Sequence, residues 1–231
     1  QLSGIAGGRL NIAVISAGDY FFPRVIAEFM RRHPGVTLNL AVHNREELLH
    51  QLAGNLTDLA VMVRPPAGMD TVNDSFAPHP YVIVAAPDHP LVGKRNVPLS
   101  ALADEAFICR EKGSDTWNSM QEGFAARLQN LRITMEIKST ETIKQAVIAN
   151  MGIAFLSAHT VALELRTGHL AVLDVEGFPV MLNWYVVHRK NKRLPPVALA
   201  FKHFLLSEGA AQIDRITAVD GLIRGKGAVR S

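Results

Sequence analysis

The sequence predicts an α/β protein of two lobes, each with a central sheet flanked by helices, and three observations lead to this fold class. Short apolar strands alternate with amphipathic helices between Leu10 and Val63, as in chains that build a parallel sheet. A second strand-and-helix series begins near Leu99. The last strand and helix, Val180–His188 and Pro196–Leu206, are too few to form a domain alone, so we expect them to complete the first lobe.

The first lobe is predicted from local patterns. Its strands are short apolar runs that cover Leu10–Ile15, Val36–His43 and Leu59–Val63. The helix Tyr20–Arg32 is amphipathic, and its apolar face consists of Phe21, Phe22, Val25, Ile26, Phe29 and Met30. His33-Pro34-Gly35 stops this helix. Asn44, followed three residues later by Glu47, fits a capping box for a second helix that ends at Gly54.

The second lobe is predicted to begin with two extended segments that enclose Ala77-Pro78-His79-Pro80. The predicted strands and extended segments of this part are Val72–Phe76, Tyr81–Ala86, Phe107–Cys109, Ile133–Ile137, Gly152–Leu156 and Leu170–Asp174. Helices are expected to run to about Gln129, to open at Ser139 and to start at Ser157.

These elements give the expected domain organisation. Residues 1–8 are interpreted as a Gly-rich linker remnant, residues 9–77 plus 179–206 as lobe I, and residues 78–178 as an inserted lobe II. After Ser207 the chain is sparse in apolar residues, so 207–231 is predicted to be a partly disordered C-terminal tail. Two strands would cross between the lobes and make a hinge beside a cleft, where ligand sites are preferred.

Composition restricts the function classes. The 231 residues are 48% hydrophobic and 19% charged, which is ordinary for a globular domain. A net charge of +3 is far from the clustered basic stripe of a DNA-binding face. The single cysteine, Cys109, excludes a disulfide framework and favours a reducing compartment. We find no membrane helix and no signal peptide at Gln1–Gly8, and therefore expect a cytoplasmic domain.

Neither a metal site nor a catalytic constellation is predicted. His33, His43 and His50 are dispersed, and no cluster of cysteines or carboxylates supports them as metal ligands. The chain has no Gly-x-Ser-x-Gly nucleophile elbow and no phosphate-loop or dinucleotide fingerprint. We therefore expect a receptor for a non-covalently bound small molecule, with no cofactor, rather than an enzyme.

The candidate binding residues of lobe I follow predicted strand ends, where open α/β sheets bind ligands. Ser16-Ala17-Gly18-Asp19 lies between a strand end and a helix N-terminus, whose free N–H groups attract anions. Alternatively, Ser16 or Asp19 caps the helix and occupies those donors. His43 ends the second strand, and Arg64 follows the third. Arg64 is the candidate for a charge-assisted contact to a carboxylate or phosphate, with a rim ion pair as its alternative role.

The candidate binding residues of lobe II lie before predicted helices or at a strand end. They are Gly113, Ser114, Thr116, Ser139, Thr140 and Phe155. A glycine at position 113 lets the backbone turn toward a ligand, and the serines and threonines offer hydroxyl groups beside two helix N-termini.

Several of these positions have a structural alternative. Thr142 with Gln145 also fits a capping box, so one of the hydroxyls near this helix start would be structural. Core packing is the alternative for Phe155. Arg110 and Lys112 could supply charge, but we expect both to be solvated at the surface.

Four stretches together resemble the effector-binding domain of LysR-type transcriptional regulators. They are Gly8–Ile15, Phe29–Val36, Asp58–Val61 and Val147–Leu156. The resemblance covers about residues 8–206 and implies a two-lobed fold of the type 2 periplasmic-binding-protein kind. In that family a winged helix-turn-helix and a linker helix precede this domain, and neither is present in this sequence. The resemblance also implies promoter DNA as a partner and a homodimer or tetramer, in whose dimers the helix Tyr20–Arg32 and the adjacent strand of one copy pair with the second lobe of the other.

Within that family the chain is most similar to regulators of Calvin-cycle operons. The stretches that carry this similarity are Tyr20–Pro23, Arg64–Pro66, Phe76–Pro80, Ile143–Val147, Phe155–Thr160, Leu173–Gly177 and Trp184–Arg189. The similarity implies a small anionic effector of carbon fixation, such as a phosphorylated sugar. Two departures make the expected site less cationic: Asp19 stands where Lys is expected, and Asp115 and Trp117 stand where Gly-Ser-Gly-Thr-Arg is expected. The alternative is a transporter's solute-binding protein of the same fold, which predicts a signal peptide and monomers.

Overall fold

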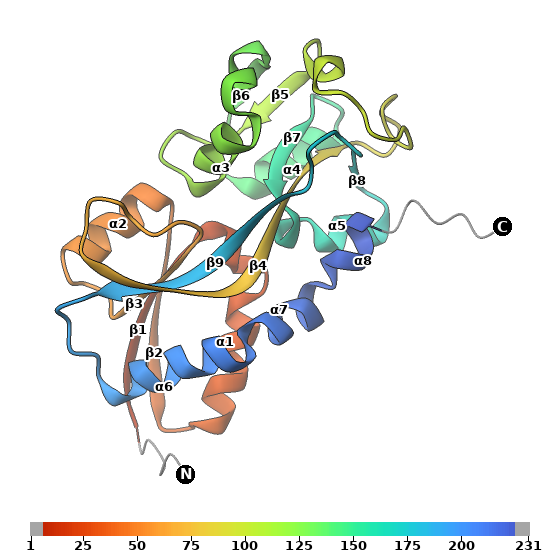
Figure 1. Cartoon of the computed structure of the whole chain (residues 1–231). Coiled ribbons are helices and arrows are strands. Elements are labelled where there is room, and N and C mark those ends of the chain that lie inside the picture. The colour runs from red at the N-terminus through yellow and green to blue at the C-terminus, as the bar shows by residue number, and fades with distance from the viewer. Residues whose placement is uncertain (1–6, 225–231) are drawn as a thin grey trace. The chain divides into compact units, whose positions relative to one another are not determined.

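The computed structural model describes residues 7–224, except the side chains of residues 128 and 129, and the chain divides into two compact units (Figure 1). Unit 1 comprises the chain up to Pro78 together with Asn183–Ile216, and unit 2 comprises His79–Leu182 together with the chain from Thr217. Strands β4 (Thr71–Ala85) and β9 (Val180–Arg189) each contain residues of both units. The predicted lobe boundaries lie within or beside these two strands, and the assignment of lobes stays a prediction.

Unit 1 is built on a parallel sheet of order β2-β1-β3, to which β9 adds in the antiparallel direction. The parallel strands cover Gly8–Ile15 (β1), Val36–His43 (β2) and Leu59–Met62 (β3). The register pairs Ile15 with His43 and Val14 with Val61. The carboxyl ends of all three strands therefore meet at one edge, and the predicted parallel sheet is confirmed.

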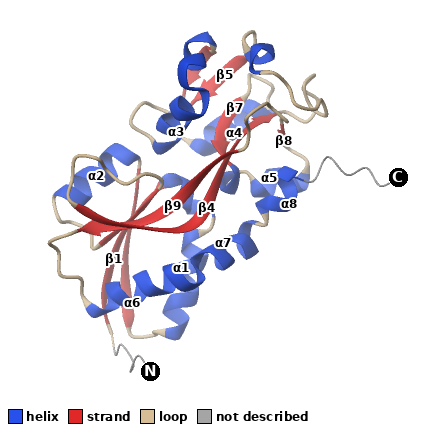
Figure 2. Cartoon of the chain, in the orientation of Figure 1, coloured by secondary structure: helices blue, strands red, loops and turns tan. Residues whose placement is uncertain are grey.

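Helices cover both faces of this sheet. Figure 2 shows α2 on one side of β1, and α1 with α6 on the other. The helices of this unit are α1 (Phe22–Arg32), α2 (Arg45–Ala53), α6 (Pro196–Phe204) and α7 (Ala210–Thr217), whose last residue belongs to unit 2. Edge-on ring contacts join Phe22 and Phe29 of α1 to Phe201 of α6. The predicted Asn44 cap is confirmed, because its side chain accepts a hydrogen bond from the backbone N–H of Glu47 at 3.0 Å.

Unit 2 combines two small sets of strands. Strands β5 and β6 pair in parallel, and the C-terminal part of β4 pairs antiparallel with β7 and β8. The elements of this unit are β5 (Ala106–Cys109), β6 (Arg132–Glu136), β7 (Ala154–Ser157), β8 (Ala171–Val172), α3 (Asp115–Phe124), α4 (Thr140–Ile148), α5 (Ala162–Thr167) and α8 (Val219–Arg224). The core centres on Ile108, Ile143, Val147 and Leu156. Among residues 7–224, no helix has the length and apolar character needed to cross a bilayer.

The structure joins two segments that the sequence predicts as separate. Val72–Phe76 and Tyr81–Ala86 belong almost entirely to the single strand β4, which continues through Pro78 and Pro80. A proline removes one backbone donor, but its fixed φ is compatible with an extended chain. The prolines therefore remove ladder hydrogen bonds without ending the strand.

The C-terminal segment is helical where a disordered tail is predicted. A π turn at Leu205–Gly209 continues α6 into α7, and α8 follows. Val219 is buried, and Leu222 and Ile223 pack against the core of unit 2. A few apolar residues at helical spacing therefore suffice once a core is available, and residues 207–224 of the predicted tail form helices. Residues 225–231, and residues 1–6 of the predicted linker, lie outside the described part of the chain.

Gly152 marks a close approach of two backbone segments in unit 2. A Cβ at this position would lie 2.5 Å from the carbonyl oxygen of Ala106, which accepts a hydrogen bond from the N–H of Ile153 at 2.8 Å. We expect Gly152→Ala to lower the free energy of unfolding by about 2 kcal/mol, measured as a lower urea midpoint at unchanged slope. Gly221→Ala is the control, because its Cβ would meet nothing within 4 Å. Equal midpoints for the two variants would contradict this prediction.

Candidate functional site

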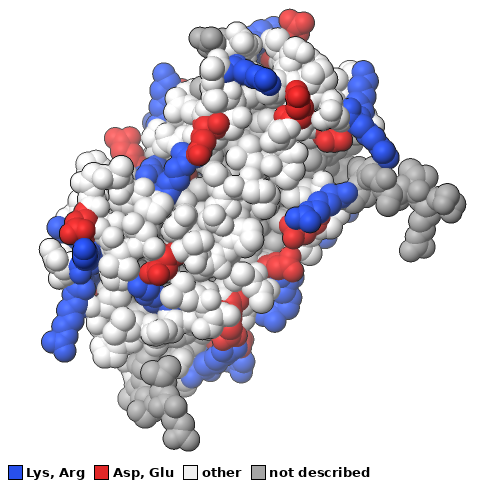
Figure 3. Space-filling model, in the orientation of Figure 1, with Lys and Arg blue, Asp and Glu red and all other residues white. Residues whose placement is uncertain are grey.

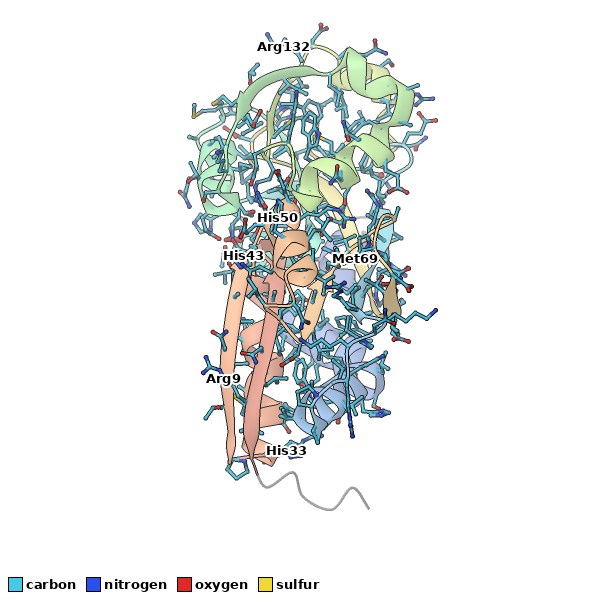
Figure 4. All side chains as sticks on the ribbon, turned by 90° about the vertical axis from the view of Figure 1, so that its left-hand side faces the viewer. Arg9, His33, His43, His50, Met69 and Arg132 are labelled. Carbon is cyan, nitrogen blue, oxygen red and sulfur yellow. The ribbon has the colours of Figure 1, made fainter. Side chains whose placement is uncertain are left out.

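Three of the predicted binding residues of unit 1 gather at the carboxyl edge of its parallel sheet. Ser16 directly follows β1, His43 is the last residue of β2, and Arg64 lies two residues after β3. Figure 4 shows His43 at this end of β2, whereas Arg9 and His33 lie toward the other end. The topology thus brings a hydroxyl, an imidazole and a guanidinium group to one edge of one sheet.

The segment after β1 is a 3-10 turn, Ser16–Tyr20, rather than the start of the long helix. Helix α1 begins later with Phe21 as its N-cap and no side-chain capping bond, so no side chain of the turn caps α1. Ala17 and Gly18 are buried, and a Cβ at Gly18 would lie 2.6 Å from a methyl group of Val14. The glycine is therefore explained by close packing. Partial desolvation raises the pKa of the Asp19 carboxyl above its ordinary range.

The loop that carries Arg64 is fastened to helix α2. The Arg45 guanidinium donates a hydrogen bond from Nη1 to the carbonyl oxygen of Arg64 at 2.6 Å. Arg45 is the first residue of α2 and directly follows the Asn44 cap. The backbone at Arg64 is thereby fixed relative to the sheet, which favours a defined position for a cationic side chain at this edge.

The predicted residues of unit 2 other than Phe155 lie in the segments that follow the carboxyl ends of β5 and β6. Gly113 has φ +97° in the loop between β5 and α3, a conformation that favours glycine. Buried polar residues are concentrated in this loop and at the starts of α3 and α4, namely Arg110, Glu111, Ser114, Asp115, Thr116, Ser119 and Thr140. Burying polar groups is costly unless they are hydrogen-bonded. Their concentration here makes this region the candidate effector site of unit 2.

Two of the predicted hydroxyls are helix caps. Ser114 caps α3, because its Oγ accepts from the N–H of Trp117 at 3.0 Å and donates to the carbonyl of Glu111 at 2.8 Å. Its only proton is therefore used within unit 2. Ser139 caps α4 by accepting from the N–H of Thr142 at 3.2 Å. The capping hydroxyl at this helix start is therefore that of Ser139, and not that of Thr142 as the Thr142–Gln145 pattern suggests.

Arg110 is buried, contrary to the expectation that it is solvated at the surface. Its Nε donates to Oε1 of Glu111 at 2.7 Å, its Nη2 to Oε2 at 3.3 Å, and its Nη1 to the hydroxyl of Thr140 at 2.9 Å. Lys112 is exposed, and its Nζ lies 5.9 Å from the ring centroid of Trp117. The buried ion pair of Arg110 and Glu111 is not among the predicted site residues. The available signal was two opposite charges directly after an apolar strand end.

Phe155 is part of an aromatic cluster in the core of unit 2. Its ring stacks on Tyr81 with the centroids 5.0 Å apart, and it also contacts Phe124 and Phe178. This packing explains why an aromatic side chain stands at position 155. A contact between Phe155 and an effector stays a prediction. Thr116 is also buried, at the start of α3.

Burial disfavours the charged form of two histidines and of the cysteine in unit 2. Nε2 of His79 lies 2.6 Å from Oγ of Ser157, and its ring stacks on His159 at a centroid distance of 5.3 Å. Burial lowers the pKa of both histidines, that of His159 to about 4. Burial also raises the pKa of the Cys109 thiol to about 12. Within the described chain, no three His, Cys, Asp or Glu residues come together as a metal site.

The surface charge is mixed in sign. On the face shown in Figure 3, Lys and Arg side chains are interspersed with Asp and Glu side chains, often next to one another, on a mostly uncharged surface. This distribution agrees with the small net charge of +3. The visible face therefore offers no continuous basic stripe for nucleic acid.

Parallel strands that end in polar and cationic residues are typical of α/β domains that bind small molecules. The chain belongs to the LysR substrate binding domain family, whose model matches residues 3–210. It is therefore the effector-binding domain of a LysR-type transcriptional regulator, with the predicted fold of the type 2 periplasmic-binding-protein kind.

Relatives and a solved structure support this assignment. The chain is 46% identical over 210 residues to the RuBisCO operon transcriptional regulator of Allochromatium vinosum, covering 91% of this chain and 70% of that protein. It is 40% identical over 211 residues to the HTH-type transcriptional activator CmpR of Synechocystis sp., covering 91% and 69%. It is also similar to the CcmR regulatory domain of Synechocystis PCC6803, solved in complex with 2-PG, with a TM-score of 0.83, 40% identity, and coverage of 87% and 96%.

These comparisons confirm the predicted fold class, the LysR family and the similarity to regulators of RuBisCO operons. All three proteins named here are regulators. They give no support to the alternative of a solute-binding protein from a transporter.

Proposed function

We propose that this chain senses a small phosphorylated metabolite of carbon fixation. The observation that carries the proposal is its 40% identity to the CcmR regulatory domain, whose structure holds 2-PG. The donor groups support it, since Arg64 lies just after strand β3 of unit 1, and Thr140 is the first residue of helix α4 in unit 2. Guanidinium and hydroxyl donors are suited to phosphate and carboxylate oxygens.

The departures from the expected pattern favour a ligand of modest charge. Asp19 adds a carboxyl group to the turn after β1, and Asp115 is buried at the start of α3. Trp117 contributes an indole in place of a guanidinium, and its ring lies near the Lys112 ammonium. Fewer cations neutralise fewer phosphate charges. A monophosphorylated acid such as 2-phosphoglycolate is therefore a better candidate than a sugar bisphosphate.

A thermal-shift titration tests this function. A ligand that binds only the folded state, present at about thirty times its Kd, stabilises it by about 2 kcal/mol. For a chain of this size we expect 2-phosphoglycolate to raise Tm by about 4 to 8 °C. Glycolate is the matched control without the phosphate group, and we expect it to leave Tm unchanged. Stabilisation by unphosphorylated acids alone would exclude the proposed ligand class.

We further propose that the domain acts without catalysis and without a resident cofactor, in a cytoplasmic homodimeric or tetrameric regulator that binds promoter DNA through a winged helix-turn-helix. The support comes from two relatives. One is a transcriptional regulator of a RuBisCO operon, and the other is a transcriptional activator of the HTH type. A ligand shifts such a regulator only through different affinities for two of its states.

A further inference from the structure

The hydrogen bond between Arg110 and Thr140 fixes the role of one hydroxyl in unit 2. Nη1 of Arg110 donates to Oγ1 of Thr140 at 2.9 Å. A guanidinium group has no acceptor, so this bond has only one direction. The hydroxyl oxygen of Thr140 therefore accepts a hydrogen bond from Arg110 through one of its lone pairs, and the hydroxyl proton remains available for donation. None of the described residues accepts that proton, although Thr140 is only 8% exposed.

Arg110 is itself held rigidly. Its Nε and Nη2 donate to the two carboxylate oxygens of Glu111 at 2.7 and 3.3 Å, and both side chains are buried. The backbone carbonyl of Glu111 in turn accepts the proton of Ser114, the cap of α3. A bidentate guanidinium–carboxylate pair is geometrically specific. The Arg110 guanidinium is therefore fixed in place, with Nη1 aimed at Thr140.

We infer that Arg110 is a positioning residue that makes Thr140 a dedicated hydrogen-bond donor to an anionic oxygen of the effector. The position agrees with this role, because Thr140 is the first residue of the nine-residue helix α4, where the helix dipole also favours negative charge. This inference rests on the proposed function. It adds a reason for anion preference that does not need a cationic side chain in contact with the ligand.

A double-mutant cycle tests the inference, with 2-phosphoglycolate as the probe and isothermal titration calorimetry as the measurement. Thr140→Val keeps the shape and removes the donor, so we expect about tenfold weaker binding. Arg110→Met releases the hydroxyl to other orientations, and we expect a similar loss. If Arg110 acts through Thr140, the double variant binds about tenfold more weakly, whereas independent effects would give about a hundredfold. Thr140→Ser restores the donor and should bind like the wild type.

Controls separate this role from a general loss of structure. Arg110→Met leaves the Glu111 carboxylate buried without its guanidinium, so the cycle is repeated in a Glu111→Gln background. Matched substitutions at exposed positions of the same unit, Arg127→Met and Thr167→Val, should change affinity less than twofold. Each variant is also checked by thermal unfolding.

The outcomes are distinct. Losses that multiply to about a hundredfold in the double variant, or no loss for Thr140→Val, overturn the inference while the proposed function stands. If the wild-type chain does not bind 2-phosphoglycolate, the proposed ligand is wrong, and the inference fails with it. A tenfold loss that is the same in both single variants and the double variant supports both.

Discussion

Replacing Lys144 by methionine is expected to lower the free energy of unfolding by about 3 to 5 kcal/mol. Lys144 is 1% exposed in unit 2. Its Nζ lies 2.9 Å from a carboxylate oxygen of Glu141 and 2.6 Å from one of Glu164, and it donates to the carbonyl of Thr160 at 2.9 Å. Removing the ammonium group leaves the Glu164 carboxylate, whose side chain is only 16% exposed, without this partner in a largely desolvated position.

Urea denaturation measures this effect, and two matched variants test its cause. The double variant Lys144→Met/Glu164→Gln removes the stranded charge and should recover at least half of the lost stability. Glu141→Gln removes the exposed partner and should cost less than about 1 kcal/mol. A single variant Lys144→Met as stable as the wild type would show that the buried ion pairs contribute nothing.

The second large effect is a loss of stability in acid that depends on His159. Burial lowers the pKa of His159 from 6.5 to about 4 in the folded state. Below pH 6.5 the unfolded chain binds a proton that the folded chain does not, so stability falls as the pH falls toward 4. Each unit of pKa shift corresponds to about 1.4 kcal/mol, and we expect a loss of about 3 kcal/mol. Burial acts on His79 in the same direction.

The measurement is the urea midpoint between pH 7 and pH 4. His159→Gln, which cannot take up a proton, should flatten the pH dependence even if the variant is less stable at pH 7. His50→Gln, at an exposed position of unit 1, should keep the wild-type slope. An unchanged slope in His159→Gln would refute the assignment of the acid sensitivity to this residue.

Elements with strong local signals were predictable from the sequence. Strand β2 has the predicted bounds Val36–His43, and Asn44 caps α2 as its pattern indicates. Elements that depend on tertiary contacts were not. Strand β4 runs through Pro78 and Pro80, and α8 forms where Val219 meets a core built from distant segments. Short helices are only marginally stable without such packing, so the local sequence of the C-terminal segment predicts a partly disordered tail.

The candidate site divides in the same way. Strand ends of a parallel sheet meet at one edge whatever their side chains, so the placement of His43 and Arg64 follows from topology. The buried state of Arg110 does not, because it requires Glu111 beside it and Thr140 on another helix. A charged residue is predicted to be exposed unless its partners are known. Thr140 lies 30 positions away from Arg110, so the sequence around Arg110 does not indicate this partner.

The state of Cys109 has a practical consequence. It is the only cysteine of the chain, it is buried beside the sulfur of Met120 at 3.7 Å, and its thiol has a pKa of about 12. Only the thiolate reacts with maleimides and disulfide reagents, so this thiol is silent near neutral pH. A cysteine introduced at an exposed position would therefore take up a fluorophore selectively. Two such cysteines, one in each unit, could carry a donor and an acceptor dye, and energy transfer would then test whether effector binding changes the distance between the dyes, with the native cysteine left in place.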